Sequence, residues 1–100
     1  MEMAEGYQNY IRGINQQAIS IQSGDDLNNY YGISKAGFYY ITTGMANISN
    51  CPAGYSMLLV ISAFNNETGQ LLFNNDVIFF RRSNGGSSSW GNWHQISLSS

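Results

Sequence analysis

Short runs of β-branched and aromatic residues alternate with glycine and asparagine along this chain, which leaves few alternatives to a fold made of strands. The first group of residues favours extended, pleated backbone, and the second favours the turns between strands. The pattern predicts six strands, at residues 17–22, 37–42, 55–64, 70–73, 77–82 and 93–98. We therefore expect an all-β fold, either a small antiparallel sheet or a sandwich, with long loops.

Two turn signals join three of these runs. Residues 65–69 contain two asparagines and end in Gly69, which can adopt positive φ. Residues 74–76 indicate a second, tighter hairpin turn. Residues 55–82 are therefore predicted to form a central three-stranded antiparallel meander. Elsewhere, residues 83–89 are expected to form a mobile loop, and residues 25–31 one short helical turn capped by an aspartate.

The chain of 100 residues is long enough for one domain, and 43% of its residues are hydrophobic and available for a core. We expect residues 17–100 to form the β domain. Apolar residues recur with no clear period in residues 1–16, which are predicted to be a tether or the remnant of a preceding shaft.

Charged residues make up only 10% of the chain, and its net charge is −2. A nucleic-acid backbone requires a basic stripe, which cannot be built from the four basic residues, Arg12, Lys35, Arg81 and Arg82. The longest apolar run, residues 57–61, is too short to cross a bilayer, and the N-terminal sequence does not have the pattern of a signal peptide. We therefore expect no nucleic-acid partner, no membrane insertion, and synthesis in a cytoplasm without a signal peptide.

The sequence offers little for catalysis or metal binding. His94 is the only histidine, and no nucleophile with an orienting group is evident near it. The acids that could form a glycosidase pair or hold calcium fall in turn-like segments, at Asp25, Asp26, Glu67 and Asp76. Cys51 is the only cysteine, which excludes a disulfide within one chain. We expect no enzymatic activity, no metal and no cofactor, with a glycan hydrolase as a remote alternative.

Aromatic residues make up 14% of the chain and are the remaining candidates for ligand binding. Sugar C–H faces stack on aromatic rings, while asparagine, glutamine and tyrosine bind sugar hydroxyls. Most of the rings fall in or beside strands and are expected in the core, whereas Tyr30 and Tyr31 lie in a polar segment and are predicted to be exposed. The candidate ligand-binding residues are Tyr30, Tyr31, Asn84 and Trp90.

Taken in order, several short blocks of the chain resemble the pyocin-knob family of tail-fibre domains. They span about residues 25–97, and the most specific part is an arginine-bearing strand followed by a glycine loop and a Trp-x-x-Trp ending. The blocks are Asp26-Leu27-Asn28, Gly37-Phe38-Tyr39-Tyr40-Ile41, Pro52-Ala53-Gly54, Leu58-Leu59-Val60-Ile61, Gln70 with Phe73, Arg81, and Trp90-Gly91-Asn92-Trp93. The resemblance implies a knob-like β domain of a tail fibre, carried on a virion or a phage-like particle.

The Trp-x-x-Trp ending is interpreted within this resemblance as a lid on the core. Trp90 and Trp93 are then expected to be largely buried, with Arg81 close enough for cation–π attraction. Trp93 and Arg81 are accordingly predicted to be structural residues.

The resemblance leaves two functions open. One is a receptor-binding or adhesion module that recognises bacterial surface glycan, for which an exposed concave patch formed by Tyr30, Tyr31 and residues 83–89 is the discriminating feature. The other is a purely structural spacer or assembly domain. The expected partners are bacterial surface glycan, other fibre domains and, as one option in the full fibre, further copies in a homotrimer.

Overall fold

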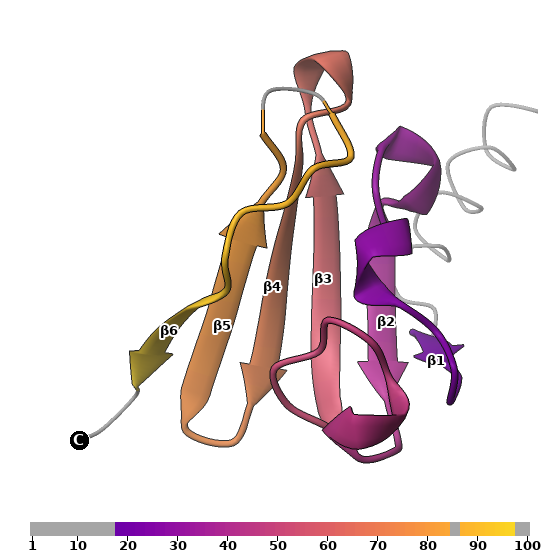
Figure 1. Ribbon diagram of the computed structural model, residues 1–100, viewed down its shortest axis with the longest axis vertical. Helices are drawn as coiled ribbons and strands as arrows, with labels where there is room; N and C mark the ends of the chain where they lie inside the picture. Colours follow the sequence, from indigo (N-terminus) through magenta and orange to yellow (C-terminus); the bar gives the residue numbers. More distant parts are fainter. Residues whose placement is uncertain (1–17, 85–86, 98–100) are drawn as a thin grey trace, which may run out of the picture.

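The computed structural model describes residues 18–84 and 87–97, so the expected tether, residues 1–16, lies outside the described residues. The described strands form one sheet, in which their spatial order is their order along the chain (Figure 1). The all-β fold is confirmed, and each of the six predicted segments overlaps one observed strand. The strands are β1 Ile19–Ile21, β2 Gly37–Ile41, β3 Ser56–Ser62, β4 Thr68–Asn74, β5 Val77–Arg82 and β6 His94–Ser97.

The sheet is mixed and not antiparallel throughout. β1 runs parallel to β2, whereas the other neighbouring strands are antiparallel. A parallel pair requires a long crossover connection, because the chain must return to the end of the sheet at which the first strand began. Residues 22–36 provide this connection.

The central meander predicted for residues 55–82 is confirmed, with β3 antiparallel to β4 and β4 antiparallel to β5. The tight turn is also found where the sequence indicates it. Asn74 pairs with Val77, so that Asn75 and Asp76 form a two-residue hairpin loop.

The turn between β3 and β4 differs from the prediction in one respect. Gly69 belongs to β4, and the left-handed backbone is instead adopted by Asn65 and Asn66, with φ of 60° and 59°. Asparagine tolerates this region better than most residues because its short polar side chain can hydrogen-bond locally. The turn includes the 3-10 helix η4, Phe64–Asn66.

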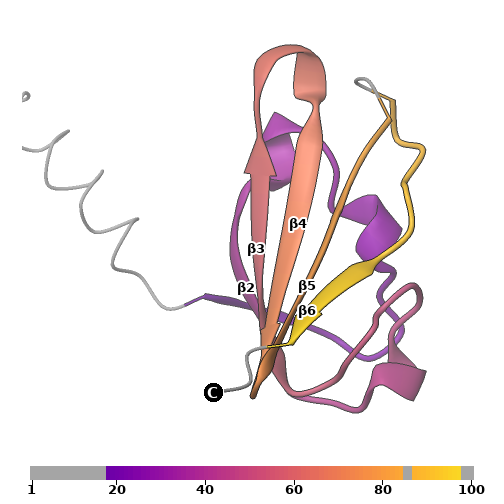
Figure 2. The ribbon, with the colours of Figure 1, turned by 90° about the vertical axis from the view of Figure 1, so that its left-hand side faces the viewer.

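One side of the sheet, here called the covered face, is packed against the connecting segments. Residues 22–36, 42–55, 83–84 and 87–93 lie on this side (Figure 2). Successive residues of a strand point to opposite sides, and on β3 it is Ser56, Leu58 and Val60 that are buried. The core consists of Ile21, Leu27, Tyr39, Ile41, Ile48, Cys51, Leu58, Val60 and Leu72.

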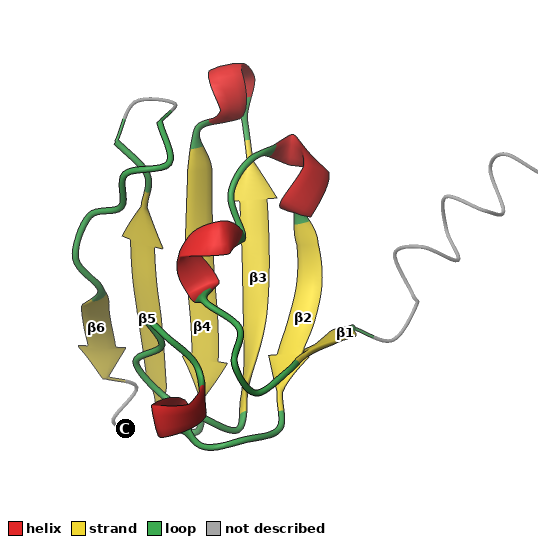
Figure 3. Cartoon of the chain, turned by 45° about the vertical axis from the view of Figure 1, so that its right-hand side comes forward, coloured by secondary structure: helices red, strands yellow, loops and turns green. Residues whose placement is uncertain are grey.

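Short 3-10 helices carry the covering segments over the sheet (Figure 3): η1 Leu27–Asn29, η2 Ile33–Lys35 and η3 Met45–Asn47. The predicted helical turn with an aspartate cap is η1, in which Asp26 accepts a hydrogen bond of 2.9 Å from the backbone N of Asn28. Leu27 is fully buried and anchors η1 in the core. The cap therefore fixes the turn that inserts this leucine.

The other side of the sheet, here called the open face, is not covered by any described segment. Large apolar side chains are exposed on it, including Phe38, Met57, Ile61, Phe80 and Ile96. The described part of the chain is thus a single sheet covered on one side, and within these residues the sandwich alternative is wrong. Among the described residues, no helix has the length and apolar character needed to span a bilayer.

Candidate functional site

Arg81 lies between the rings of Trp90 and Trp93, with its Cζ atom 4.4 Å and 4.5 Å from the two ring centroids. The segment after β5 turns back over the sheet, because Ser83 pairs with Trp90 and Gly91 N donates to Arg82 O. Arg81, Trp90 and Trp93 are called the tryptophan clamp below. The cation–π contact predicted from the sequence is present, on both tryptophans.

The tryptophan clamp is less enclosed than predicted. Arg81 is buried, but Trp90 and Trp93 are each only half-buried. The rings cover the guanidinium on two sides and leave their own outer surfaces in contact with solvent. The clamp therefore serves as a lid on Arg81 and presents aromatic surface on the outside.

Buried Gln70 fixes the Arg81 side chain by a hydrogen bond. Arg81 Nε donates to Gln70 Oε1 at 2.9 Å, and Gln70 Nε2 donates to the carbonyls of Leu27 and Tyr30 at 2.8 and 3.1 Å. Burial lowers the pKa of Arg81 to about 10, while the charges of Asp26 and Cys51 act in the opposite direction. The guanidinium therefore remains charged at neutral pH.

Two buried polar atoms beside Trp90 have no hydrogen-bond partner among the described residues: Arg81 Nη2 and Asn28 Oδ1. Unpaired polar groups are costly to bury, so most proteins contain few of them. Asn28 contributes to the site through its backbone, since its carbonyl accepts a hydrogen bond of 3.1 Å from Trp90 Nε1. Both atoms are buried, so they add a cost to the folded state in place of a contact that a ligand could reach.

Trp93 is fixed by the loop before β3. Its Nε1 atom donates to Asn50 O at 2.9 Å, and its ring packs against the core. Asn50 in turn donates from Nδ2 to Asp26 Oδ1 at 2.7 Å. This bond, the one from Asn28 N and the charge of Arg81 lower the pKa of Asp26, although partial burial opposes them.

Tyr31 is placed against the clamp. Its ring meets that of Trp90 edge to face, with 6.3 Å between the centroids, and both residues are half-buried. These two candidate ligand-binding residues, called the Tyr31–Trp90 pair below, are 59 positions apart in the sequence and lie together on the covered-face side. Edge-to-face geometry leaves part of each ring available to a ligand.

Tyr30 does not form the predicted exposed pair with Tyr31. Its ring packs edge to face on Tyr39 with centroids 4.8 Å apart, and its hydroxyl donates to Asp25 Oδ2 at 3.1 Å. Burial, followed by the bond to Asp25, raises the pKa of Tyr30 to about 12. Lys35 Nζ lies 5.6 Å from the ring centroid. Tyr30 is thus a half-buried packing residue, because consecutive side chains here point in different directions.

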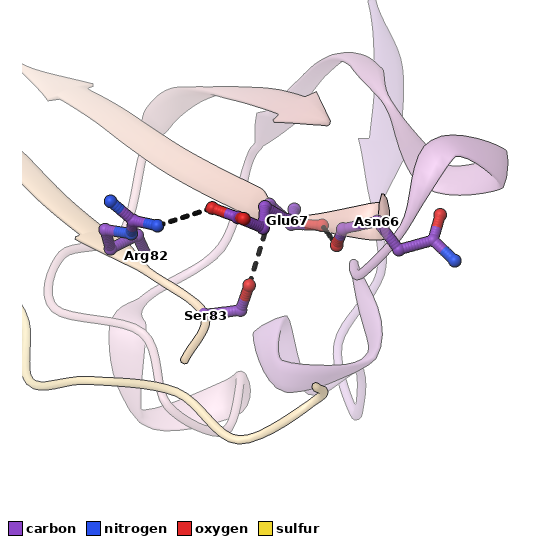
Figure 4. Close-up of polar contacts among 5 residues, drawn as sticks. Asn66, Glu67, Arg82 and Ser83 are labelled. Carbon is purple, nitrogen blue, oxygen red and sulfur yellow. Dashed lines mark hydrogen bonds and ion pairs between the residues drawn. The ribbon is translucent and has the colours of Figure 1, made fainter. Parts of the chain in front are cut away.

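Asn84 is exposed and follows Ser83 directly, at the start of the glycine-serine loop. Asn84 N donates to Ser89 O at 2.8 Å, which closes the loop, while residues 85–86 lie outside the described residues. The base of the loop is tied to β4, since buried Ser83 accepts from Thr68 N at 3.0 Å. Beside it, Arg82 pairs with Glu67 at 2.6 Å (Figure 4).

The acidic side chains either accept hydrogen bonds within turns or lie far from one another. Asp25 Oδ2 accepts from Gln22 N at 2.9 Å, and Asp26 caps η1. Glu67 and Asp76 lie at opposite ends of β4, which is seven residues long. Within residues 18–84 and 87–97, no three His, Cys, Asp or Glu side chains are grouped as metal ligands require.

His94 and Cys51 are also accounted for by packing. His94 is exposed on β6 and stacks on Phe80, with centroids 5.2 Å apart. Cys51 is buried, its thiol donates to Ala53 O at 3.0 Å, and burial raises its pKa.

Two features are not among those predicted from the sequence. The first is the role of buried Gln70 and of Asn50 in fixing the clamp, since their partners lie far away in the sequence. The second is a groove at one end of the open face, lined in part by Tyr40, Tyr55, Phe73 and Asn75. The sequence carries a signal for this groove, because Tyr55 directly precedes the apolar run of β3 and Asn75 lies in the turn between two apolar strands.

No protein-family model matches the chain, and neither a curated protein nor a solved structure is found to be similar to it.

Proposed function

We propose that this chain is a non-catalytic knob domain of a phage or phage-like tail fibre, which adheres to bacterial surface glycan. The observation that carries the proposal is the Tyr31–Trp90 pair, held at the surface over a buried arginine. The resemblance of the sequence blocks to tail-fibre knobs supplies the biological setting. In that setting the domain is made in the host cytoplasm, and its partners are other fibre domains and the glycan.

The Tyr31–Trp90 pair suits a saccharide. Arg81 and the bond from Trp90 Nε1 to Asn28 O restrain the indole, so little side-chain entropy remains to be lost on binding. A restrained ring can stack on sugar C–H groups, and Asn28, Asn29 and Asn84 are nearby in the chain segments that form the site. Because charged groups are scarce, the expected ligand is neutral.

The structural spacer is the second candidate, and one observation favours it. The indole N–H groups of Trp90 and Trp93 are both donated to backbone carbonyls, so neither is left to bind a ligand. This arrangement is the one expected if the clamp only closes the core. The hydrolase is the weakest candidate, since Asp25 and Asp26 serve as turn acceptors.

Binding of the chain to an array of bacterial surface glycans, with and without substitutions, tests the proposal. Tyr31→Ala and Trp90→Ala are expected to weaken binding at least about 10-fold, the usual effect of removing a central aromatic contact. Tyr55→Ala is the matched control, because Tyr55 is more exposed and lies near the opposite end of the sheet. Binding should change little between low and moderate salt.

Three results would contradict the proposal. Absence of binding to any glycan by the folded wild-type chain would favour the spacer. Binding that persists in both substituted chains would place the ligand elsewhere, and binding that collapses with salt would identify a charged ligand in place of a neutral one.

A further inference from the structure

The strands of the central meander are apolar on both sides. β3 reads SMLLVIS, β4 contains the run LLF and β5 begins VIFF. A strand with one face in water usually alternates apolar and polar residues, whereas near-continuous apolar runs are typical of strands buried on both faces. Residues 18–84 and 87–97 cover only one of the two faces, so the strands carry more apolar surface than this part of the chain buries.

The open face is large enough for a protein interface. Phe38, Met57, Ile61, Phe80 and Ile96 are between 38% and 62% exposed. With about 200 Å² for each such side chain, these residues and their half-buried neighbours expose on the order of 600 Å² of apolar surface. This is at the upper limit of the patches found on monomers, and it matches the apolar part of a standard interface of about 800 Å² per partner. The half-buried neighbours are Tyr40, Leu59, Leu71, Phe73 and Ile78.

The open face is almost without charge. Among the described residues, the charged groups at it are Arg82 and Glu67, which pair with each other at one end. His94 lies near the edge on β6 and stacks on Phe80. A surface of this kind meets no like-charge repulsion from an identical surface, and depletion of charge is the compositional mark of an interface core.

We propose that the open face packs against the open face of a second copy of this chain, so that two single sheets form one β-sandwich. Sheets pack face to face at about 10 Å through interdigitating side chains, and a twofold axis brings identical patches together. Both Tyr31–Trp90 pairs would remain accessible, because they lie on the covered-face side. The association does not depend on the proposed function.

Light scattering coupled to size-exclusion chromatography of the full chain tests this directly. The wild-type protein is expected at twice the 11.1 kDa of one chain. Met57→Glu puts a carboxylate on the open face in each copy and is expected to weaken the dimer at least about 100-fold, giving one-chain mass at micromolar concentration. Ile33→Glu is the matched control, since Ile33 is 67% exposed against 62% for Met57 but lies on η2, outside the strands that form the open face. It should leave the dimer intact.

A second measurement guards against misfolding of the substituted chain. The melting temperature of a dimer rises with protein concentration. It should do so for the wild type and for Ile33→Glu, and become independent of concentration for Met57→Glu with the circular dichroism spectrum unchanged. A monomeric wild type, which would mean that another part of the chain or another protein covers the face, overturns the proposal. So does an assembly that survives Met57→Glu, and so does a three-chain mass, which would favour the homotrimer.

Discussion

Gln70 and Arg81 face each other on neighbouring strands, and Arg81 Nε donates to Gln70 Oε1 at 2.9 Å inside the fold. The same glutamine donates to the carbonyls of Leu27, the first residue of η1, and Tyr30, which follows its last residue. One buried side chain therefore connects the sheet, the first covering segment and the tryptophan clamp. The position of Trp90 and Tyr31 at the surface depends on this connection.

Arg81→Ala is expected to lower the free energy of unfolding by about 2–3 kcal/mol. It removes two cation–π contacts and leaves Gln70 Oε1 without its donor, although it also relieves the cost of burying a charge. The neighbouring Arg82→Ala is the control and should cost less than about 1 kcal/mol, because Arg82 forms an exposed ion pair. Urea denaturation of both variants measures the difference; equal costs would mean that the clamp adds nothing to stability.

Trp93→Ala should destabilise the fold more than Trp90→Ala. Trp93 packs against the core and bonds to Asn50, but it is half exposed, so we expect about 2–3 kcal/mol, less than for a fully buried tryptophan. Trp90 lies further out and should cost about 1–2 kcal/mol. Thermal melts of the two variants give the order. A reversed order would show that Trp90 is the main structural ring and would weaken its assignment to ligand binding.

Strand positions could be predicted from the sequence because they depend on local preference. The runs at 37–42 and 77–82 and the turn at 74–76 need no information from elsewhere in the chain. The direction of Tyr30 depends instead on Tyr39 and Gln70, which local sequence does not reveal. The same limit applies to the open face, since an apolar run predicts that a surface is buried without saying whether the same chain buries it.

The candidate site could be predicted only in part, for a related reason. Trp90 and Arg81 were indicated by their types and by the sequence resemblance. Gln70 and Asn50 look like ordinary polar residues, and their importance comes from partners 11 or more positions away. Aromatic rings can therefore be picked out from the sequence, whereas the polar residues that hold those rings in place cannot.

Gly54→Ala is expected to destabilise the protein by at least about 2 kcal/mol. A Cβ atom at this position would collide with Thr43 O and lie 2.7 Å from Met45 N, and these backbone atoms cannot move aside without distorting the loop. Gly44→Ala is the control in the same loop, because nothing lies within 4 Å of its added Cβ. Its stability should stay within about 0.5 kcal/mol of the wild type. If both variants unfold at the same urea concentration, the close approach at Gly54 is not a constraint in solution.

Asp26 should make the stability of the fold sensitive to acid. Hydrogen bonds from Asn50 and Asn28 lower its pKa in the folded chain below the ordinary value of 3.8. A carboxyl with a lowered folded pKa contributes stability that is present above pH 3.8 and is lost as the pH falls through the folded pKa, because the unfolded chain then binds the proton more tightly. Wild-type stability should therefore drop as the pH falls below 3.8, and Asp26→Asn should flatten that part of the profile. Asp76→Asn, in the exposed β4–β5 turn, should retain the wild-type profile. Urea denaturation at a series of pH values decides the matter, and an Asp26→Asn profile that stays as steep as the wild-type one would show that this cap contributes no proton-linked stability.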